Sequence, residues 1–492
     1  MQNGSRWCFA LFLLGISIDA LQAEPNPNIT IGVFGQEIAH DLSAAGMPEG
    51  PLTTLWLDEN GQLWLGGAVG VGCWRDGAWQ PVAGLPAAPV RAIQGRPGTV
   101  FIAYAHEIWQ VQPSGASPRV QGFAGTIHAL AVTESALYAS TSLGVFSERE
   151  GHLELDTALQ ALMGDGNLPL TIACGHQGEL AVGGEMGLFT QSPGGAWQAH
   201  DPASADGKSW AVRQVCGVGY DSAGNLWFCS AQGVGVRSSE WRLYAGPDGL
   251  PYAEFTSLTV APDDTVWFAT RLGAIHFDGQ EWAYRQGRRW LPHDAVAAIA
   301  VNARGDAWFA TAGGLGQIER RPMTLAEKAA FYEDEMERYI KRTAFGYVSE
   351  VALAKPGDKS TVVQSDSDND GLWTSMYGAG ECFAYAATKD PQAKRRAQQA
   401  FEALRFLSVA PAQGEVEQQP GFVARTVVPT TEPDPNLRES YTVEGMKRRR
   451  QHEDGQWKVY FPRWPKTQDG AYWYKTDTSS DELDGHYFFY PI

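Results

Sequence analysis

Short runs of hydrophobic residues recur along the first two thirds of the chain at a nearly constant interval. Seven of them have an apolar or aromatic centre, and they are Leu63–Gly67, Val100–Ala103, Leu137–Ser140, Leu180–Gly184, Leu226–Cys229, Val266–Thr270 and Ala307–Thr311. Their centres lie about 41 residues apart. Each is preceded by another apolar run and followed by a glycine-containing turn and further short strands. Four strands per repeat of about 40 residues are typical of a propeller blade, so the pattern predicts a seven-bladed β-propeller.

The last repeat lacks an outer strand, because a helix signal follows it directly. The apolar stretch Ile29–Phe34 precedes the first full repeat. We expect this stretch to supply the missing strand and to close the ring, since an open ring would expose sheet edges.

The repeats also resemble a known class. The segments Gly224–Trp227 and Thr265–Thr270, the second followed by Gly273, are similar to the two-component-regulator propeller repeat of exported bacterial proteins. The resemblance covers roughly residues 29–321. It implies a fold and leaves the activity open, because propellers carry many functions.

The hydrophobic period changes at Pro322 from that of strands to that of helices. Thr324 and Glu327 form a capping box that begins a helix reaching to about residue 342. A second helix is predicted from Thr374 or Ser375, and a third begins with Asp390 as N-cap and a proline at its first position. The short link between the second and third predicts an αα-hairpin.

Three segments of this second part resemble the start of an (α/α) toroid, and they are Asp366–Trp373, Gly421–Arg425 and Asp477–His486. Polysaccharide lyases and glycoside hydrolases share that fold. The chain ends on an apolar segment just after an expected capping box at Ser479 and Glu482, so we expect an incomplete toroid. The predicted organisation is a signal peptide at 1–23, a seven-bladed propeller at 24–321 and a toroid-like α-helical domain at 322–492.

Residues 1–23 have the pattern of a secretory signal. Arg6 precedes an apolar stretch from Trp7 to Ile18, and Leu21-Gln22-Ala23 suits cleavage. The apolar stretch is too short for a membrane span, and no second one follows. We therefore expect a secreted or periplasmic protein without a membrane span.

The chain of 492 residues has a formal net charge of −18, which argues against a nucleic-acid partner. The five cysteines downstream of the signal show no zinc-binding spacing. If Tyr220 faces Asn225 across a turn, Cys216 faces Cys229. Opposed cysteines can form a disulfide, and two buried free thiols are the other interpretation.

An acidic motif precedes the second predicted helix. Asp366, Asp368 and Asp370 alternate and are followed by Gly371, as in the first half of a calcium loop. Tyr377 occupies the position at which such a loop ends on glutamate. The motif therefore predicts either a calcium site or a solvated acidic loop at a helix N-terminus.

In toroids, the loops that enter the inner helices line the cleft, and this resemblance brings segments 366–373 and 477–486 together. The candidate catalytic residues are Asp481, Glu482, His486, Tyr487 and Glu381. The candidate substrate-binding residues are Trp373, Arg425, Tyr377 and Asp477. A glycoside hydrolase needs two carboxyl groups, and a lyase needs a base with a cation that stabilises the developing charge. For His486, Tyr487 and Arg425, which would serve a lyase, a structural role is the favoured interpretation.

The basic run Lys447–Arg450 is expected to be a solvated loop that can attract an acidic polysaccharide. Together these features predict an exported carbohydrate-active protein that binds or cleaves polysaccharide by lyase or hydrolase chemistry. The alternative is a non-catalytic, ligand-binding or sensory propeller ectodomain.

Overall fold

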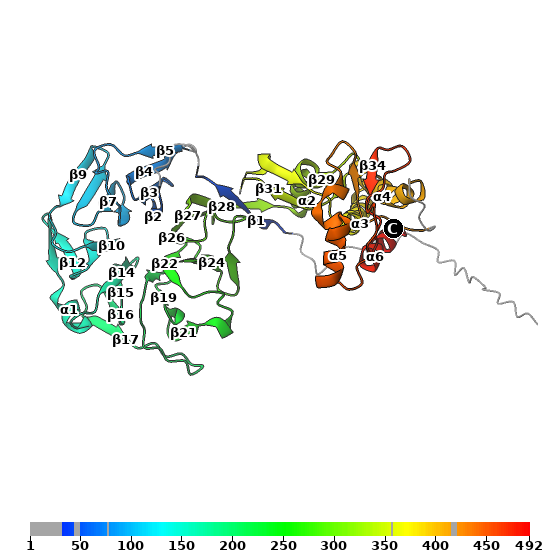
Figure 1. The fold of residues 1–492 in the computed structure, drawn as a ribbon. Coiled ribbons are helices and arrows are strands. Elements are labelled where there is room, and N and C mark those ends of the chain that lie inside the picture. The colour runs from blue at the N-terminus through cyan, green and yellow to red at the C-terminus, as the bar shows by residue number, and fades with distance from the viewer. Residues whose placement is uncertain (1–31, 44–49, 76–77, 356–357, 415–420) are drawn as a thin grey trace, which may run out of the picture.

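The structure is a computed structural model that describes residues 32–43, 50–75, 78–355, 358–414 and 421–492. The predicted signal peptide lies outside these ranges. The chain forms a ring of small sheets, followed by a separate part in which helices and short strands mix (Figure 1). Among the described residues, no helix is both long and apolar enough to cross a bilayer.

The ring is a seven-bladed β-propeller, as predicted, because seven sheets of four antiparallel strands follow one another along the chain. Blades one to three consist of β2 (Leu52–Leu57), β3 (Leu63–Gly67), β4 (Gly70–Arg75), β5 (Ala78–Pro81), β6 (Ala92–Arg96), β7 (Thr99–Ala103), β8 (Ile108–Gln112), β9 (Gly115–Val120), β10 (Ile127–Val132), β11 (Leu137–Thr141), β12 (Gly144–Arg149) and β13 (His152–Leu155).

Blades four to seven consist of β14 (Pro169–Cys174), β15 (Leu180–Gly184), β16 (Leu188–Gln191), β17 (Trp197–His200), β18 (Gly217–Tyr220), β19 (Leu226–Ser230), β20 (Gly233–Arg237), β21 (Trp241–Tyr244), β22 (Phe255–Val260), β23 (Val266–Thr270), β24 (Gly273–Phe277), β25 (Trp282–Arg285), β26 (Val296–Val301), β27 (Ala307–Thr311), β28 (Gly314–Met323) and, from the N-terminus, β1 (Phe34–Asp41). A short helix, α1 (Thr157–Met163), joins blades three and four. Every predicted repeat centre lies in the second strand of a blade.

An N-terminal strand closes the ring. β1 pairs antiparallel with β28 and is the outermost strand of blade seven. Of the expected strand at 29–34, residues 29–31 lie outside the described residues; β1 begins at Phe34, which pairs with Met323 at the end of β28. Glu37 forms an ion pair of 2.6 Å with Arg285 in blade six, which fastens the closing strand to a second blade.

The repeated tryptophans form part of the core between blades. Trp64, Trp227 and Trp267 are buried. The indole N–H groups of Trp64 and Trp227 donate to Asp58 and Asp221, the aspartates of the preceding turns. The repeat phase of these residues is thus explained by packing.

The register of blade five differs by one residue from the predicted one. Tyr220 lies opposite Leu226, because Asp221 caps a five-residue turn by accepting hydrogen bonds from the Ala223 and Asn225 N–H groups. Gly217 is therefore opposite Cys229. The Sγ atoms of Cys216 and Cys229 lie 3.7 Å apart, and both residues are free thiols.

The second part contains α2 (Leu325–Glu335), α3 (Asp370–Thr388), α4 (Pro391–Ala412), α5 (Val443–His452) and α6 (Ser480–Phe489). Three two-stranded ladders lie between them: β29 (Lys341–Arg342) with β30 (Tyr347–Val348), β31 (Val351–Leu353) with β32 (Val362–Gln364), and β33 (Val427–Pro429) with β34 (Tyr472–Tyr474). The Thr324–Glu327 capping box and the αα-hairpin of α3 and α4 are confirmed.

Two local predictions about these helices are wrong. α3 begins at Asp370, four residues before the predicted start, because the acidic motif runs directly into the helix. The expected capping box at Ser479 does not form, since Glu482 turns toward α3. α3 packs against both α4 and α6, and Leu404, Leu407 and Tyr347 are among the fully buried residues of this core. The toroid stays a prediction.

Candidate functional site

The two segments that were expected to share a cleft do lie together, at the N-terminal end of α3. The Leu372 N–H donates to Glu482 Oε2 over 3.0 Å. A Cβ atom on Gly371 would lie 2.7 Å from His486 Nε2, so the absence of a side chain there lets α6 approach α3 closely. The Lys475 ammonium contacts the Asp368 carboxylate.

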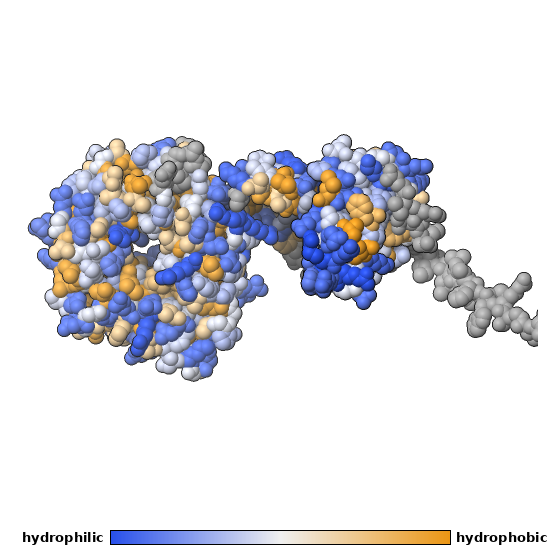
Figure 2. Space-filling model, viewed as in Figure 1, coloured by the Kyte–Doolittle hydropathy of each residue, from blue (hydrophilic) through white to orange (hydrophobic). Residues whose placement is uncertain are grey.

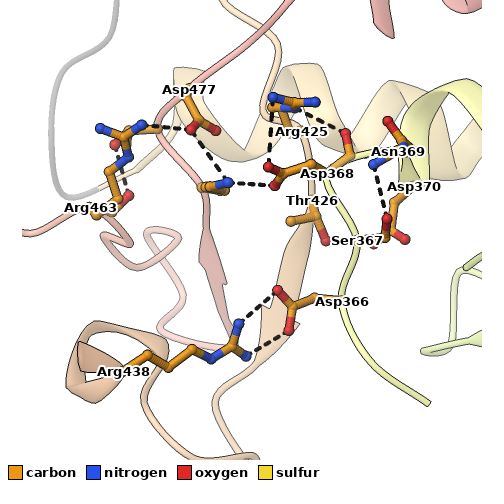
Figure 3. A network of polar contacts seen from close by, with 12 residues as sticks. Asp366, Ser367, Asp368, Asn369, Asp370, Arg425, Thr426, Arg438, Arg463 and Asp477 are labelled. Atoms are coloured by element: carbon orange, nitrogen blue, oxygen red, sulfur yellow. Dashed lines mark hydrogen bonds and ion pairs between the residues drawn. The ribbon is translucent and has the colours of Figure 1, made fainter. Parts of the chain in front are cut away.

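The three aspartates of the acidic motif each pair with different cations, and Figure 3 shows the pairs made by Asp366 and Asp368. Arg438 binds Asp366 with two hydrogen bonds of 2.6 and 2.9 Å. The Asp370 carboxylate lies 2.5 Å from Arg342 Nη2. In the described ranges no three acidic, histidine or cysteine side chains converge as metal ligands. The geometry thus offers the predicted calcium site no support, and the site stays a prediction.

Asp370 fixes the start of α3 to the rest of the domain. It is fully buried, and it accepts hydrogen bonds from Arg342 and from the Thr426 hydroxyl. Burial raises the pKa of Asp370, and the Arg342 guanidinium opposes that rise. Arg342 also donates to the Val427 carbonyl oxygen in β33, so this pair holds helix and strand together.

Asp368 is the exposed aspartate of the motif, with 45% of its side chain accessible. Arg425 approaches its carboxylate to 3.7 Å and donates to its carbonyl oxygen over 3.0 Å. Lys475, which is buried, bridges Asp368 to Asp477, and Asp477 pairs with Arg463 over 2.7 Å (Figure 3). Burial alone would lower the pKa of Lys475, but the two carboxylates raise it overall. We call these five residues the Asp368 network.

Glu482 and His486 point into the protein rather than into solvent. Only 3% of Glu482 and 2% of His486 is exposed. Burial raises the pKa of Glu482 to about 7 and lowers that of His486 to about 4. His486 Nδ1 is hydrogen-bonded to the Tyr490 hydroxyl over 2.8 Å. In this structure both residues join α6 to α3, and neither is accessible to a large substrate.

Three other candidates lie nearer the surface. Asp481 is exposed and accepts a hydrogen bond from Ser479, and this hydroxyl helps to lower the pKa of Asp481. Tyr487 is 69% exposed, and Trp373 is half-buried. Among the described residues, no hydrogen bond or ion pair joins these three to Asp368.

Glu381 and Tyr377 belong to a different cluster. Glu381 is ten residues along α3 from Gly371, which corresponds to about 15 Å of helix. The Tyr377 hydroxyl donates to Glu333 of α2 over 2.8 Å. Burial and the hydrogen-bonded Glu333 carboxylate raise the pKa of Glu381 to about 8. The structure therefore separates these two candidates from Glu482 and His486.

A cationic surface next to the Asp368 network was only partly anticipated. The basic run expected to be a loop is helical and lies in the middle of α5. Figure 2 shows a strongly hydrophilic patch over this helix. The Arg449 guanidinium stacks 3.7 Å from the centre of the Trp457 ring, and Arg463 lies 4.4 Å from it. No sequence pattern indicates this stack, because its members come from three separate segments. We call Arg438, Lys447, Arg448, Arg449 and Arg450 the cationic face.

Solved structures match a little under three fifths of the chain, and they share its β-propeller fold. No family profile and no curated protein matches the chain. Among solved structures, the extracellular domain of a protein described as a hybrid two-component system of B. thetaiotaomicron matches 58% of this chain with 13% identity and a TM-score of 0.47. This chain spans about two fifths of the length of that structure, 39%.

A streptogramin B lyase matches over 59% of this chain and 98% of its own, with 15% identity and a TM-score of 0.48. The virginiamycin B lyase of Staphylococcus aureus matches over 57% and 99%, with 14% identity and a TM-score of 0.48. Similarity at this level does not assign a function.

Proposed function

We propose that this protein is an exported polysaccharide-binding protein whose helical domain holds an acidic polysaccharide or oligosaccharide on the cationic face. The observation that carries the proposal is the stack of Arg449 and Arg463 on Trp457, next in sequence to the exposed side chains of Lys447, Arg448 and Arg450 on α5. The proposal keeps the binding function that both sequence interpretations share.

The charge of α5 is opposite to that of the chain. Its ten residues include four Lys or Arg and one Glu, while the whole chain has a net charge of −18. Arg448 and Lys447 pair with Glu439 and Glu444 over 2.5 and 2.9 Å, but all four side chains are more than half exposed. Such surface pairs are weak and can be exchanged for ligand groups.

Arg450 has no hydrogen bond or ion pair within the described part of the chain, and its side chain is exposed. A guanidinium group binds carboxylate or sulfate groups through two parallel hydrogen bonds. Repeating anionic groups on one chain can therefore bind several members of the cationic face at once.

The Asp368 network positions one side of this surface. Arg463 contacts Trp457 and Asp477 together, so the stack is attached to the chain of ion pairs that reaches Asp368. These contacts fix the guanidinium plane before a ligand arrives, which lowers the entropy cost of binding.

Cleavage by lyase or hydrolase chemistry stays a prediction for the candidate catalytic residues. Burial of Glu482 and His486 favours binding over catalysis. Alanine at Asp481, Glu482 and His486 tests this point, because it would abolish cleavage and would leave binding to the cationic face unchanged.

The binding test uses polygalacturonate and heparin as anionic probes and dextran as a neutral probe. We expect both anionic probes to bind, dextran not to bind, and salt to weaken binding through screening. Arg448→Ala with Arg450→Ala should weaken binding about tenfold, or about 1.4 kcal/mol. The matched control is Arg395→Ala with Arg405→Ala, which removes two exposed cations from α4 of the same domain. Equal binding by both double variants would refute the proposal, as would binding of dextran.

A further inference from the structure

The propeller has a pocket of about 690 Å³ beside blade five, on a different domain from the cationic face. It is lined by β21, by the turn before that strand, by the end of β24 and by the chain between β17 and β18. Its volume lies within the range of small-molecule sites.

One wall of the pocket is aromatic. Tyr244 contacts Phe277 and Trp282 at ring-centre distances of 5.4 and 5.6 Å. Trp241 packs edge-on against Phe228 at 5.7 Å. Tyr244 and Trp241 are half-buried, so part of each ring remains accessible from the pocket.

The polar atoms of this wall are not used by the fold. Neither the Tyr244 hydroxyl nor the Trp241 indole N–H has a hydrogen-bond partner among the residues that the structure describes. Elsewhere in the propeller, Tyr220 donates to the Leu180 carbonyl oxygen over 3.2 Å, and Trp197 donates to Asp156 over 2.8 Å. The two groups beside the pocket are therefore free to bind a ligand.

The connection between β17 and β18, which also lines the pocket, is held in place before any ligand binds. Lys208, in the connection between β17 and β18, pairs with Asp248 over 2.8 Å and donates to the Leu243 carbonyl oxygen over 3.2 Å. Ser204 forms a parallel bridge with Trp241. The connection is thus fixed to β21 and to the turn that follows it, and the pocket is preformed.

The lining also indicates the class of ligand. Its charged side chains are Asp206, Lys208, Glu240, Arg242 and Asp248. Two are basic and three are acidic, so the pocket does not select for a strongly charged ligand. Accessible aromatic rings next to unpaired donors and acceptors suit a molecule with an apolar face and many hydroxyl groups.

We propose that the pocket between Trp241, Tyr244 and Lys208 binds a neutral saccharide of one or two rings. The sugar ring lies against Trp241 and Tyr244, and its hydroxyl groups bind the Tyr244 hydroxyl, the indole N–H and the charged rim. The site is separate from the cationic face, so the two proposals succeed or fail independently.

Titration calorimetry with cellobiose, maltose and lactose, each to about 10 mM, tests the proposal, since a site of this kind binds with a Kd of about 0.1–1 mM. We expect at least one of the three to bind. Tyr244→Phe removes only the hydroxyl, and Trp241→Phe keeps an aromatic ring, so both variants should fold and should weaken binding at least fivefold.

Two variants serve as controls. Arg75→Ala alters the corresponding groove between blades one and two and should leave saccharide binding unchanged. The Arg448→Ala, Arg450→Ala variant should also bind the saccharide normally. The proposal is overturned if none of the three saccharides binds, if phenol binds in their place, or if Tyr244→Phe and Trp241→Phe both bind like the unmodified protein.

Discussion

Replacing Glu381 by glutamine should remove a large pH dependence from the stability of the helical domain. Glu381 is 5% exposed, and its Oε2 atom is buried without a hydrogen-bond partner in the described structure. Burial and a hydrogen bond to Glu333 of α2 raise the pKa of Glu381, and Glu333 also accepts a hydrogen bond from Tyr377. Glutamine keeps an N–H donor for Glu333 and cannot ionise.

The magnitude follows from the pKa of Glu381, which rises from an ordinary value of 4.5 to about 8 on folding. An acid with a raised folded pKa binds more protons in the folded state, so stability is lost as pH increases from the lower value to the higher one. Each pH unit in this window costs about 1.4 kcal/mol. Between pH 5 and pH 8 the unmodified domain should therefore lose about 3–4 kcal/mol that Glu381→Gln retains.

The assay is urea unfolding at pH 5, 6, 7 and 8, followed by far-UV circular dichroism, because most helical residues belong to this domain. The matched control is Glu402→Gln, a half-exposed glutamate of α4, which should show the slope of the unmodified protein. If the unfolding free energy of Glu381→Gln falls with pH as steeply as that of the unmodified protein, the inferred protonation of Glu381 is wrong.

Three further predictions concern other elements. Gly485→Ala should lower the free energy of unfolding of the helical domain by about 1–3 kcal/mol in urea, because the new Cβ would lie 2.3 Å from Ser375 Oγ. The control is Gly380→Ala, whose Cβ would have no atom within 4 Å, and it should raise that free energy by about 0.5–1 kcal/mol. Because burial lowers the pKa of His486 to about 4, the unmodified domain should lose about 2–3 kcal/mol of unfolding free energy as pH falls from 6.5 toward 4, and His486→Gln should not. If the unfolding free energies of both proteins fall equally over this pH range, the prediction is wrong. A chain that begins after β1 loses eight paired positions, so scanning calorimetry should show the propeller destabilised by at least about 4 kcal/mol; an unchanged melting temperature would refute closure by this strand.

The propeller could be predicted because its signal is local and repeated. Alternating apolar residues and glycine turns define a strand without reference to distant residues, and seven copies reinforce one another. The first residue of the closing strand could not be predicted in the same way, because it depends on how far its partner β28 extends, which is to Met323. The predicted pairing of Cys216 with Cys229 is wrong by one residue, because Asp221 caps a turn that is one residue longer than the sequence suggested.

The candidate site was predictable as a meeting of segments and not as an arrangement of side chains. Helix-entry motifs brought residues 366–373 and 477–486 together correctly. Whether a carboxyl group faces solvent or a neighbouring helix depends on packing, and Gly371 with Gly485 allows α6 to approach α3 so closely that Glu482 becomes buried. Sequence spacing does not report that approach.

The acidic motif shows the same limit and gives a final prediction. Alternating aspartates suit a cation, but the sequence does not say whether the cation is a metal ion or a side chain. Asp366 forms an ion pair with Arg438, Asp370 with Arg342, and Asp368 with the buried Lys475, so side-chain cations already neutralise all three carboxylates. A calcium ion would have to displace all three partners and leave the buried Arg342 without its counter-charge Asp370, which is strongly unfavourable, whereas Lys475 would keep only Asp477. We therefore expect excess EGTA or added calcium to leave the melting temperature of the helical domain unchanged, with magnesium as the control ion. A calcium-dependent rise that magnesium does not reproduce would show that the metal replaces these ion pairs.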